Sequence, residues 1–278
     1  METFTIKRIS ILGCGWLGLP LAISLINKGF KIKGSTTSIE KLDLLKVNSI
    51  APFLVQLGEN DNDNFSSFLE SQLLIINVPP GRNKDNVNDY SDKMQILAKA
   101  ISQSSLKKII FISSTSVYEE CNDKVDEKTL KLSNDESGKR MIAAENIFKN
   151  LINIETTIIR MAGLIGPKRH PGRFFAGKEN IPDGLVPVNL ILLDDCIGII
   201  EHVINHDLWN QTFNGSAPTH PTKMEFYDLA SQQLYGKEAK FIAEKGNYKI
   251  VDSSKIMNEG YQFKHPDLME WLLQTPQN

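Results

Sequence analysis

The stretch RISILGCGWLG spans residues 8–18 and decides how the rest of the chain is interpreted. Its first five residues are typical of a buried β-strand, and GCGWLG follows with the glycine spacing GxGxxG. The apolar pattern over residues 17–28 then predicts a helix that is closed by Gly29. Three glycines between a strand and a helix are typical of the turn that holds the diphosphate of a dinucleotide. The sequence therefore predicts a dinucleotide-binding site at this turn.

Each glycine of this motif has a physical reason. Gly13 permits the tight turn, Gly15 lets the backbone approach the phosphates, and Gly18 lets the helix pack closely on the sheet. The start of the helix offers N–H groups and a partial positive charge to the phosphates. A glycine-rich turn without a ligand is the competing interpretation. We predict that the cofactor site is formed by Gly13, Cys14, Gly15, Trp16, Leu17 and Gly18.

Residues 1–165 alternate apolar strands with helical patterns. Beyond the first strand and helix, strands are predicted at residues 31–34, 51–57, 73–78, 108–113 and 156–160. Helices are predicted at residues 39–46, 87–102 and 139–151. Strands that are apolar throughout are covered on both faces, and intervening helices imply parallel pairing through right-handed crossovers. We therefore predict an α/β fold in which residues 1–165 form a Rossmann-type, doubly wound parallel sheet.

The pattern changes after Gly166-Pro167. Residues 167–187 contain four prolines and no clear period, which predicts a long, partly ordered connection over the site. The remaining chain predicts strands at residues 188–193 and 212–214, helices at 194–204 and 223–234, and two short C-terminal helices. We expect residues 166–278 to form a smaller substrate-side lobe without a core of its own, and so no independent domain.

The end of the second strand bears on the choice of cofactor. Ser35, Thr36 and Thr37 stand about 20 residues after the glycines, where an acid usually binds the 2′-hydroxyl of the ribose. No acid occurs until Glu40, which we place on the next helix. An acid would repel a 2′-phosphate, whereas hydroxyl groups and the nearby Lys41 can accept one. We predict cofactor contacts by the three hydroxyl residues and a preference for NADP, with NAD as the alternative.

A second cofactor-side segment follows the strand at residues 73–78, which stops at Pro79-Pro80. A chain that turns at the carboxyl end of a central strand lies near the ligand in this type of sheet. We therefore predict that Asn77, Val78 and Pro79 contact the cofactor. A strand end without a ligand is the alternative.

Composition excludes several classes of protein. The 278 residues include 31 Lys and Arg against 33 Asp and Glu, so no basic excess indicates nucleic acid or an anionic membrane as a partner. The three cysteines are odd in number and far apart in the sequence, which argues against a disulfide framework. The first residues lack the apolar core of a signal peptide, and we expect a cytoplasmic protein. We expect no metal site, because His202 and His206 do not belong to an HExxH motif.

Further segments resemble a known family. They are FISSTSVY at residues 111–118, IRMAGLIGP at 159–167, VNLILLDD at 188–195 and FNG at 213–215. In this order after GCGWLG, they resemble the NAD-dependent epimerase/dehydratase family, the extended short-chain dehydrogenases/reductases. The resemblance covers essentially the whole chain, and the combination is more specific than any one segment.

The resemblance implies site residues and a substrate class. It places the family's active hydroxyl, which hydrogen-bonds the reacting substrate oxygen, on Ser114. Ser116 and Tyr118 follow on the same strand end as candidate substrate contacts, although the matching tyrosine of the family usually has a structural role. The implied substrate is a small polar molecule such as a sugar or nucleotide-sugar derivative. The resemblance leaves a homodimer open.

The chain departs from the family at the residues that form the catalytic base. The family uses a Tyr-x-x-x-Lys helix, in which the lysine lowers the pKa of the tyrosine. Aligned on Gly138 and on Ala143-Ala144-Glu145, this chain has Ser137 in place of the tyrosine and Met141 in place of the lysine. A serine hydroxyl cannot act as the tyrosine base does, and a methionine thioether has no charge with which to lower a pKa. The closer match is an atypical subgroup that keeps the fold and the glycine motif but lacks the pair.

Two further residues are candidates for substrate binding. Arg169 and His170 lie in the connection that starts at Gly166, and a cation and an imidazole there can bind an anionic substrate or donate a proton. Solvent contacts are the plainer interpretation of such loop residues. Two functions stay open: an NAD(P)-dependent oxidoreductase of the epimerase/dehydratase type, and a non-catalytic dinucleotide-binding sensor or scaffold.

Overall fold

The computed structural model of the protein describes residues 6–58, 62–80 and 87–274. Within these residues the chain divides into two compact units. Unit 1 comprises Met1–Ser113, Asp135–Ile159 and Ile200–Thr212, and unit 2 comprises Ser114–Asn134, Arg160–Ile199 and Phe213–Asn278. Each unit therefore draws on three stretches of chain. This division differs from the single boundary that we predict after residue 165, because the segments that follow several strands belong to unit 2.

The main sheet has seven strands among the described residues, in the order β10-β7-β5-β4-β1-β2-β3. They are β1 (Arg8–Leu12), β2 (Lys31–Thr36), β3 (Ala51–Leu54), β4 (Leu73–Ile76), β5 (Lys108–Ser114), β7 (Glu155–Met161) and β10 (Thr212–Gly215). β1 pairs in parallel with both β2 and β4, β2 with β3, and β4 with β5. The predicted doubly wound sheet is confirmed. Its strand order reverses at β1 and β4, which is where such sheets bind ligands.

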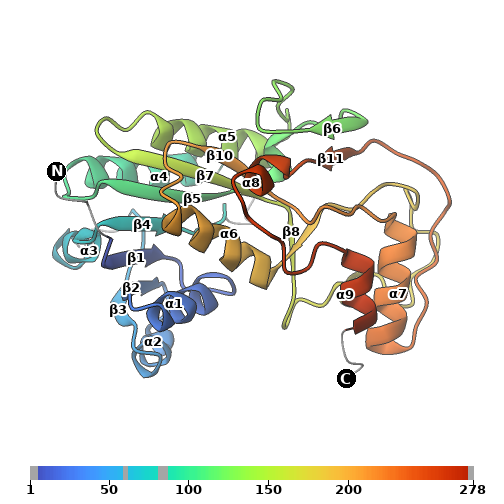
Figure 1. The fold of residues 1–278 in the computed structure, drawn as a ribbon, viewed down its shortest axis with the longest axis horizontal. Helices are drawn as coiled ribbons and strands as arrows, with labels where there is room; N and C mark the ends of the chain where they lie inside the picture. Colours follow the sequence, from blue (N-terminus) through green and yellow to red (C-terminus); the bar gives the residue numbers. More distant parts are fainter. Residues whose placement is uncertain (1–5, 59–61, 81–86, 275–278) are drawn as a thin grey trace. The chain divides into compact units, whose positions relative to one another are not determined.

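The strands of unit 1 are buried as their composition predicts. All four residues of β4 and the apolar centre of β5 are fully buried. Helix α1 packs on β2, α2 packs on β3, and α4 packs on α5 (Figure 1). The helical elements of this unit are α1 (Gly18–Asn27), η1 (Ile39–Lys41), α2 (Leu42–Val47), α3 (Asn62–Leu69), α4 (Val87–Ser102) and α5 (Glu136–Lys149). Helix α3 was not predicted from the sequence, because its residues NDNFSSFL are mostly polar.

Unit 2 contains two small parallel ladders. β6 (Asp123–Val125) pairs with β11 (Lys249–Val251), and β8 (Gly163–Ile165) pairs with β9 (Leu190–Leu192). Its other elements are η2 (Thr115–Val117), η3 (Pro171–Phe174), α7 (Lys223–Tyr235), α8 (Ser254–Asn258) and α9 (Leu268–Gln274). Helix α6 (Leu193–Asn205) runs from unit 2 into unit 1. β6 and β11 have three residues each and lie far apart in sequence, so no local pattern predicts their pairing.

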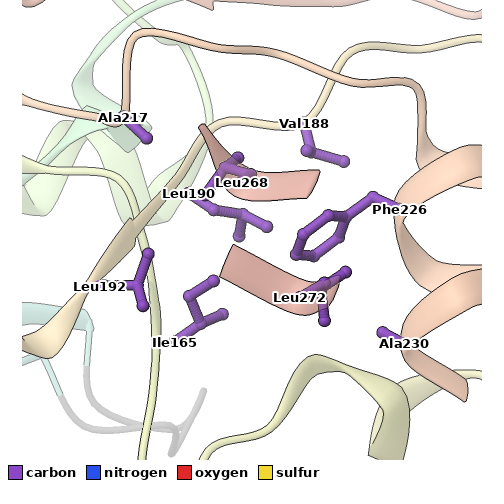
Figure 2. Close-up of a cluster of buried hydrophobic side chains, with 9 residues drawn as sticks. All are labelled: Ile165, Val188, Leu190, Leu192, Ala217, Phe226, Ala230, Leu268 and Leu272. Carbon is purple, nitrogen blue, oxygen red and sulfur yellow. The ribbon is translucent and has the colours of Figure 1, made fainter. Parts of the chain in front are cut away.

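Unit 2 has a hydrophobic cluster of its own, unlike the lobe without a core that we expect from the sequence. Figure 2 shows the cluster, with the ring of Phe226 from α7 pointing into it. Nine buried side chains form it: Ile165, Val188, Leu190, Leu192, Ala217, Phe226, Ala230, Leu268 and Leu272. Strand β9, helix α7 and helix α9 all contribute. Burial of this apolar area stabilises unit 2 from within.

The connection at residues 167–187 is more ordered than predicted. Its second half is held by backbone hydrogen bonds, from Ile181 N–H to Lys240 O (3.1 Å) and from Ile242 N–H to Ile181 O (2.8 Å). Its first half packs so closely on α7 that a Cβ at Gly172 would lie 2.1 Å from the Ala230 oxygen. Proline and glycine end regular elements here, but their backbone groups still find partners in unit 2. In the part of the chain that the structure describes, no helix combines the length and the apolar character needed to cross a bilayer.

Candidate functional site

The three glycines of the motif have different surroundings. Gly13 has a φ of +99°, and a Cβ there would lie 2.6 Å from the backbone oxygen of Asn77. A Cβ at Gly18 would lie 2.2 Å from the backbone oxygen of Gly13. Gly15 is exposed, and apart from its two chain neighbours no atom of the described residues lies within 4 Å of its Cβ position. The backbone of the protein therefore requires glycine at two positions, whereas the third faces open space, as close approach of a ligand to the backbone requires.

The glycine loop is braced from the strands on either side of β1. At the end of β2, the hydroxyl of Ser35 accepts a hydrogen bond from Gly13 N–H (2.9 Å), and its carbonyl accepts one from Cys14 N–H (2.8 Å). At the end of β4, Asn77 Nδ2 donates to Gly13 O (3.1 Å), and Asn77 N–H donates to Leu12 O (2.9 Å). The ends of β1, β2 and β4 therefore meet at one loop. Ser35 is 2 % exposed, so its side chain shapes this loop from within.

Two motif residues turn their side chains inward. Leu17 is buried, and the Cys14 sulfur packs over Gly34 of β2, where a Cβ would lie 2.7 Å from it. Burial raises the pKa of the Cys14 thiol to about 12, so the thiol stays neutral at physiological pH. Trp16 is half-buried. The motif thus offers backbone groups on its outer side and packing groups on its inner side.

A tight turn follows β2. The hydroxyl of Thr36 accepts a hydrogen bond from Ser38 N–H (3.2 Å), and the next residue, Thr37, is exposed. Ser38 Oγ donates to the carboxylate of Glu40 on η1. This hydrogen bond lowers the pKa of Glu40, so its carboxylate is charged at neutral pH. Lys41 is exposed beside it. An acidic side chain, Glu40, and a basic side chain, Lys41, therefore both follow the end of β2, where we predict the ribose of the cofactor.

The segment after β4 also lies at the glycine loop. A Cβ at Gly13 would lie 3.4 Å from Val78 Cγ2, and Pro79 is exposed. The hydroxyl of Tyr90 on α4 donates to Val78 O (3.0 Å) and so holds the segment in place. Burial raises the pKa of Tyr90, which keeps this donor protonated. The continuation of the segment at Gly81 lies outside the described residues.

Helix α5 contains Ser137 and Met141, which we predict from the sequence to stand in place of the tyrosine and lysine of the epimerase/dehydratase family. Ser137 is exposed in its first turn, and Met141 is 3 % exposed one turn later. A further turn along, the buried carboxylate of Glu145 accepts a hydrogen bond from Ser113 Oγ (2.7 Å) and pairs with Lys149 (3.2 Å). These contacts join α5 to the end of β5 within unit 1. Helix α5 therefore has a hydroxyl at Ser137, a thioether at Met141 and a paired carboxylate at Glu145, but no tyrosine–lysine pair at these positions.

The strand end that carries Ser114 belongs to unit 2. Ser114 caps η2, and its hydroxyl accepts a hydrogen bond from Ser116 N–H (3.1 Å). The hydroxyl oxygen of Ser116 is buried and has no hydrogen-bond partner within the described residues. Buried hydroxyl groups nearly always have a partner, so an unpartnered one needs an explanation such as a ligand or an ordered water.

Tyr118 is buried in the same unit. Its ring is 1 % exposed, its hydroxyl donates to Asn214 Oδ1 (2.7 Å), and it accepts from Arg160 (2.9 Å). The Arg160 guanidinium also lies 4.9 Å from the centre of the ring. Burial raises the pKa of Tyr118 in spite of this nearby cation. Tyr118 therefore supports the turn from inside unit 2.

Arg169 and His170 lie on a turn before η3. Arg169 N–H donates to Gly166 O (2.9 Å), and the Arg169 side chain is partly exposed. His170 Nδ1 accepts from Gly172 N–H (3.2 Å), which places the proton of the neutral ring on Nε2. Burial lowers the pKa of His170, so the neutral form dominates at pH 7. The His170 ring centre lies 6.2 Å from that of Trp271 on α9.

The described residues contain no group of three or more His, Cys, Asp or Glu side chains that could hold a metal ion. His202 lies in the last turn of α6 and His206 directly follows the helix. Their tilted rings have centres 3.9 Å apart, and Nδ1 of His206 lies 3.0 Å from the backbone oxygen of His202. The pair is therefore better explained by packing at the end of a helix.

No protein-family model matches the chain. Protein YeeZ from Escherichia coli (strain K12) is 34% identical over 267 residues, which cover 94% of this chain and 97% of that protein. The chain belongs to the YeeZ family.

Solved structures show the fold of this YeeZ-family chain. UDP-glucuronic acid 4-epimerase from Bacillus cereus in complex with NAD has a TM-score of 0.80 and 20% identity, with 96% of each chain covered. A short-chain dehydrogenase/reductase superfamily protein from Agrobacterium tumefaciens with bound NAD also has a TM-score of 0.80, with 14% identity and coverage of 96% of this chain and 95% of that chain. At these identities the likeness establishes the fold. The fold implied by the resemblance to epimerases and dehydratases is thereby confirmed.

In this member of the YeeZ family, the structure brings together residues from three separate predicted segments at one loop: Gly13, Ser35 and Asn77. The roles of Ser35 and Asn77 as braces could not be predicted from the sequence, because a hydroxyl or an amide after a strand does not reveal its partner. The hydrogen bond between Ser38 and Glu40 was also not predicted. A serine two residues before a glutamate at the start of a helical turn was the available signal.

Proposed function

We propose that this protein binds a nicotinamide dinucleotide at its glycine loop and acts as an oxidoreductase of the epimerase/dehydratase type on a small polar substrate. The contrast among the three glycines carries the proposal. Contacts within the protein explain Gly13 and Gly18, whereas Gly15 leaves an exposed gap over the backbone at the start of α1. A diphosphate fits such a gap, because it needs close backbone approach and N–H donors.

The finer choice of cofactor is part of the proposal. We propose a preference for NADP, because Thr36 and Thr37 carry hydroxyl groups and Lys41 carries a positive charge where many such sites carry an acid. Asn77, Val78 and Pro79 complete the cofactor side after β4. The charge of the nearby Glu40 works against this preference, because it repels a 2′-phosphate.

The substrate side of the proposal rests on unit 2. When bound, a nicotinamide ring supplies a hydride acceptor or donor. Ser114 would hydrogen-bond the substrate oxygen that gains or loses a proton, and the unpartnered hydroxyl of Ser116 would make a second contact. Arg169 and the Nε2–H of His170 would bind an anionic part of the substrate. The UDP-sugar epimerase of the same fold supports a sugar or nucleotide-sugar derivative as the substrate class.

Binding and turnover test the proposal in two steps. Titration with NAD and NADP, followed by intrinsic tryptophan fluorescence and by calorimetry, should show saturable binding. Incubation with cofactor and a panel of sugars and UDP-sugars, including UDP-glucuronic acid, should then produce a change in nicotinamide absorbance or an isomerised product. Ser114→Ala should abolish turnover while cofactor binding persists. Turnover that is unchanged in Ser114→Ala would contradict the assignment of the active hydroxyl.

A non-catalytic sensor or scaffold is the second candidate function. It is supported by the sequence of α5, in which we propose that Ser137 and Met141 replace the tyrosine and lysine of the epimerase/dehydratase family. The loss of a general acid–base group typically lowers a rate by about 10²–10⁴-fold. Tight binding of a dinucleotide without oxidation, reduction or isomerisation of any substrate in the panel would favour this second function. The homodimer and the cytoplasmic location stay predictions from the sequence.

A further inference from the structure

We infer that Arg160 is a positioning residue: through the hydroxyl of Tyr118 it holds the turn on which Ser114 and Ser116 lie. The inference rests on the proposed role of Ser114 as the hydroxyl that contacts the substrate. It adds a buried cation that lies 42 residues after Tyr118 in the sequence. All four residues belong to unit 2, so the argument stays within one compact unit.

The turn η2 has little to hold it from within. At its start, Ser114 Oγ accepts a hydrogen bond from Ser116 N–H (3.1 Å), which orients the Ser114 hydroxyl. At its end, Tyr118 N–H donates to Thr115 O (3.2 Å). A single 3₁₀ turn has few hydrogen bonds, and their geometry is poorer than in an α-helix. The orientation of the Ser114 hydroxyl therefore depends on how Tyr118, the residue that ends the turn, is held.

Tyr118 is held at its backbone and at its ring. Its carbonyl accepts a hydrogen bond from Lys249 Nζ (2.9 Å). Its hydroxyl accepts from Arg160 Nη1 (2.9 Å) and donates to Asn214 Oδ1 (2.7 Å). The Asn214 amide is fixed in turn, because its Nδ2 donates to Asp252 O (2.9 Å). Burial raises the pKa of Tyr118, so the hydroxyl keeps the proton that it donates.

Arg160 is a buried cation, with 6 % of its surface exposed. Its guanidinium donates to the Tyr118 hydroxyl and lies 4.9 Å from the centre of the Tyr118 ring. A buried charge is a poor source of folding stability, because its desolvation offsets much of what its contacts contribute. The planar guanidinium donates only in fixed directions, however, and so restricts where its acceptor can lie. Arg160 therefore contributes the orientation of Tyr118 and, through Tyr118, that of the turn.

Hydrogen exchange of the Ser116 amide, followed by NMR, tests the inference without a substrate. Tyr118→Phe removes the hydroxyl and Arg160→Met removes its donor, so both variants lose the same hydrogen bond. Tyr261→Phe is the matched control, because Tyr261 is a buried tyrosine of unit 2 whose hydroxyl donates to Asp195 Oδ1 (2.8 Å). We expect exchange at Ser116 to rise at least about tenfold in Tyr118→Phe and Arg160→Met and to keep the wild-type rate in Tyr261→Phe. Tyr118→Phe changes a single oxygen atom and gives the measurement even where Arg160→Met does not fold.

Turnover tests the consequence for Ser114. With a substrate that the wild type converts, Tyr118→Phe should lower kcat about tenfold and leave KM unchanged, because a misplaced reacting group slows the chemical step. The Kd for the dinucleotide should also stay unchanged, because the glycine loop belongs to unit 1. Both constants are measured at a temperature at which circular dichroism shows the variant to be fully folded.

The outcomes separate this inference from the proposed function. Wild-type exchange at Ser116 in Tyr118→Phe overturns the inference, and so does an equal rise in Tyr261→Phe, which would reflect a general loss of stability. An unchanged kcat in Tyr118→Phe overturns it as well, and in each of these cases the proposed function stands. If the wild type converts no substrate but Tyr118→Phe raises exchange at Ser116, the proposed function fails, whereas the hold of Arg160 on the turn stands.

Discussion

Replacing Gly15 with alanine should separate the folding of the glycine loop from its ability to bind a dinucleotide. Gly15 has a backbone conformation outside the positive-φ region, and beyond its chain neighbours no atom in the described part of the chain lies within 4 Å of its Cβ position. A methyl group there meets no steric barrier from those residues. Alanine also restricts the unfolded chain, which adds about 0.4–1 kcal/mol to the free energy of unfolding at a compatible site. For a chain of this size, the melting temperature should rise by up to about 4 °C.

The same methyl group should damage binding. It would occupy the space through which a diphosphate approaches the backbone, so we expect the dissociation constant for a dinucleotide to rise at least about tenfold, which is about 1.4 kcal/mol. Gly18→Ala is the contrasting variant, because its Cβ would lie 2.2 Å from Gly13 O. Such overpacking typically costs about 1–3 kcal/mol of folding free energy. The two variants should therefore move stability in opposite directions.

Thermal unfolding followed by circular dichroism, with and without ligand, measures both effects. At about 100 times the dissociation constant, a ligand that binds only the folded state adds about 2.7 kcal/mol to the free energy of unfolding of the wild type. Gly15→Ala should be at least as stable as the wild type without ligand and should lose most of this protection. If Gly15→Ala binds dinucleotides as tightly as the wild type, the open space over Gly15 is not the phosphate site, and the reasoning is refuted.

Three further predictions concern single side chains. Asn77→Ala removes the donor to Gly13 O and should lower the free energy of unfolding by about 1 kcal/mol and weaken dinucleotide binding; calorimetry that finds wild-type affinity contradicts the role of this brace. Lys249→Met removes the ammonium group that donates to the buried Tyr118 carbonyl (2.9 Å), so the free energy of unfolding should fall by about 1–3 kcal/mol. Urea unfolding measures this loss, and an unchanged midpoint would contradict the stabilising role of the hydrogen bond. Burial lowers the pKa of His220 in the folded state, so the unfolded chain takes up the proton first as the pH falls. Stability should therefore decrease below about pH 6.5, and less so in His220→Gln; parallel pH profiles of the two proteins would count against this.

The sheet was predictable because its signals are local. The apolar run at residues 73–78 corresponds to β4 (Leu73–Ile76), and the run at 108–113 corresponds to β5 (Lys108–Ser114). A strand that is apolar on both faces has to be covered on both faces, which leaves few architectures other than a doubly wound sheet. The glycine motif adds the position of the turn at which we propose that a dinucleotide binds, because strand, turn and helix follow one another within residues 8–28.

The division into units and the order in the second half were not predictable in the same way. The three-residue strands β6 and β11 are too short to show a period, and each depends on a partner far away in the sequence. The connection at residues 167–187 has the composition of an irregular loop, yet it is held by hydrogen bonds to residues near Lys240 and by packing on α7. Composition does not reveal a partner that the chain reaches only after folding.

The sequence by itself determined the class of fold and the place of the glycine turn, because glycine spacing and apolar period act within one turn or one strand. Only the tertiary structure decided which partners the polar side chains of each unit have. It directed the Ser35 hydroxyl and the Asn77 amide to the loop, buried Tyr118 against Arg160, and folded the Glu40 carboxylate back onto Ser38. A hydroxyl, an amide or a carboxylate has the same local signature whether it faces solvent, a ligand or the backbone, and its partner is settled only when distant strands come together.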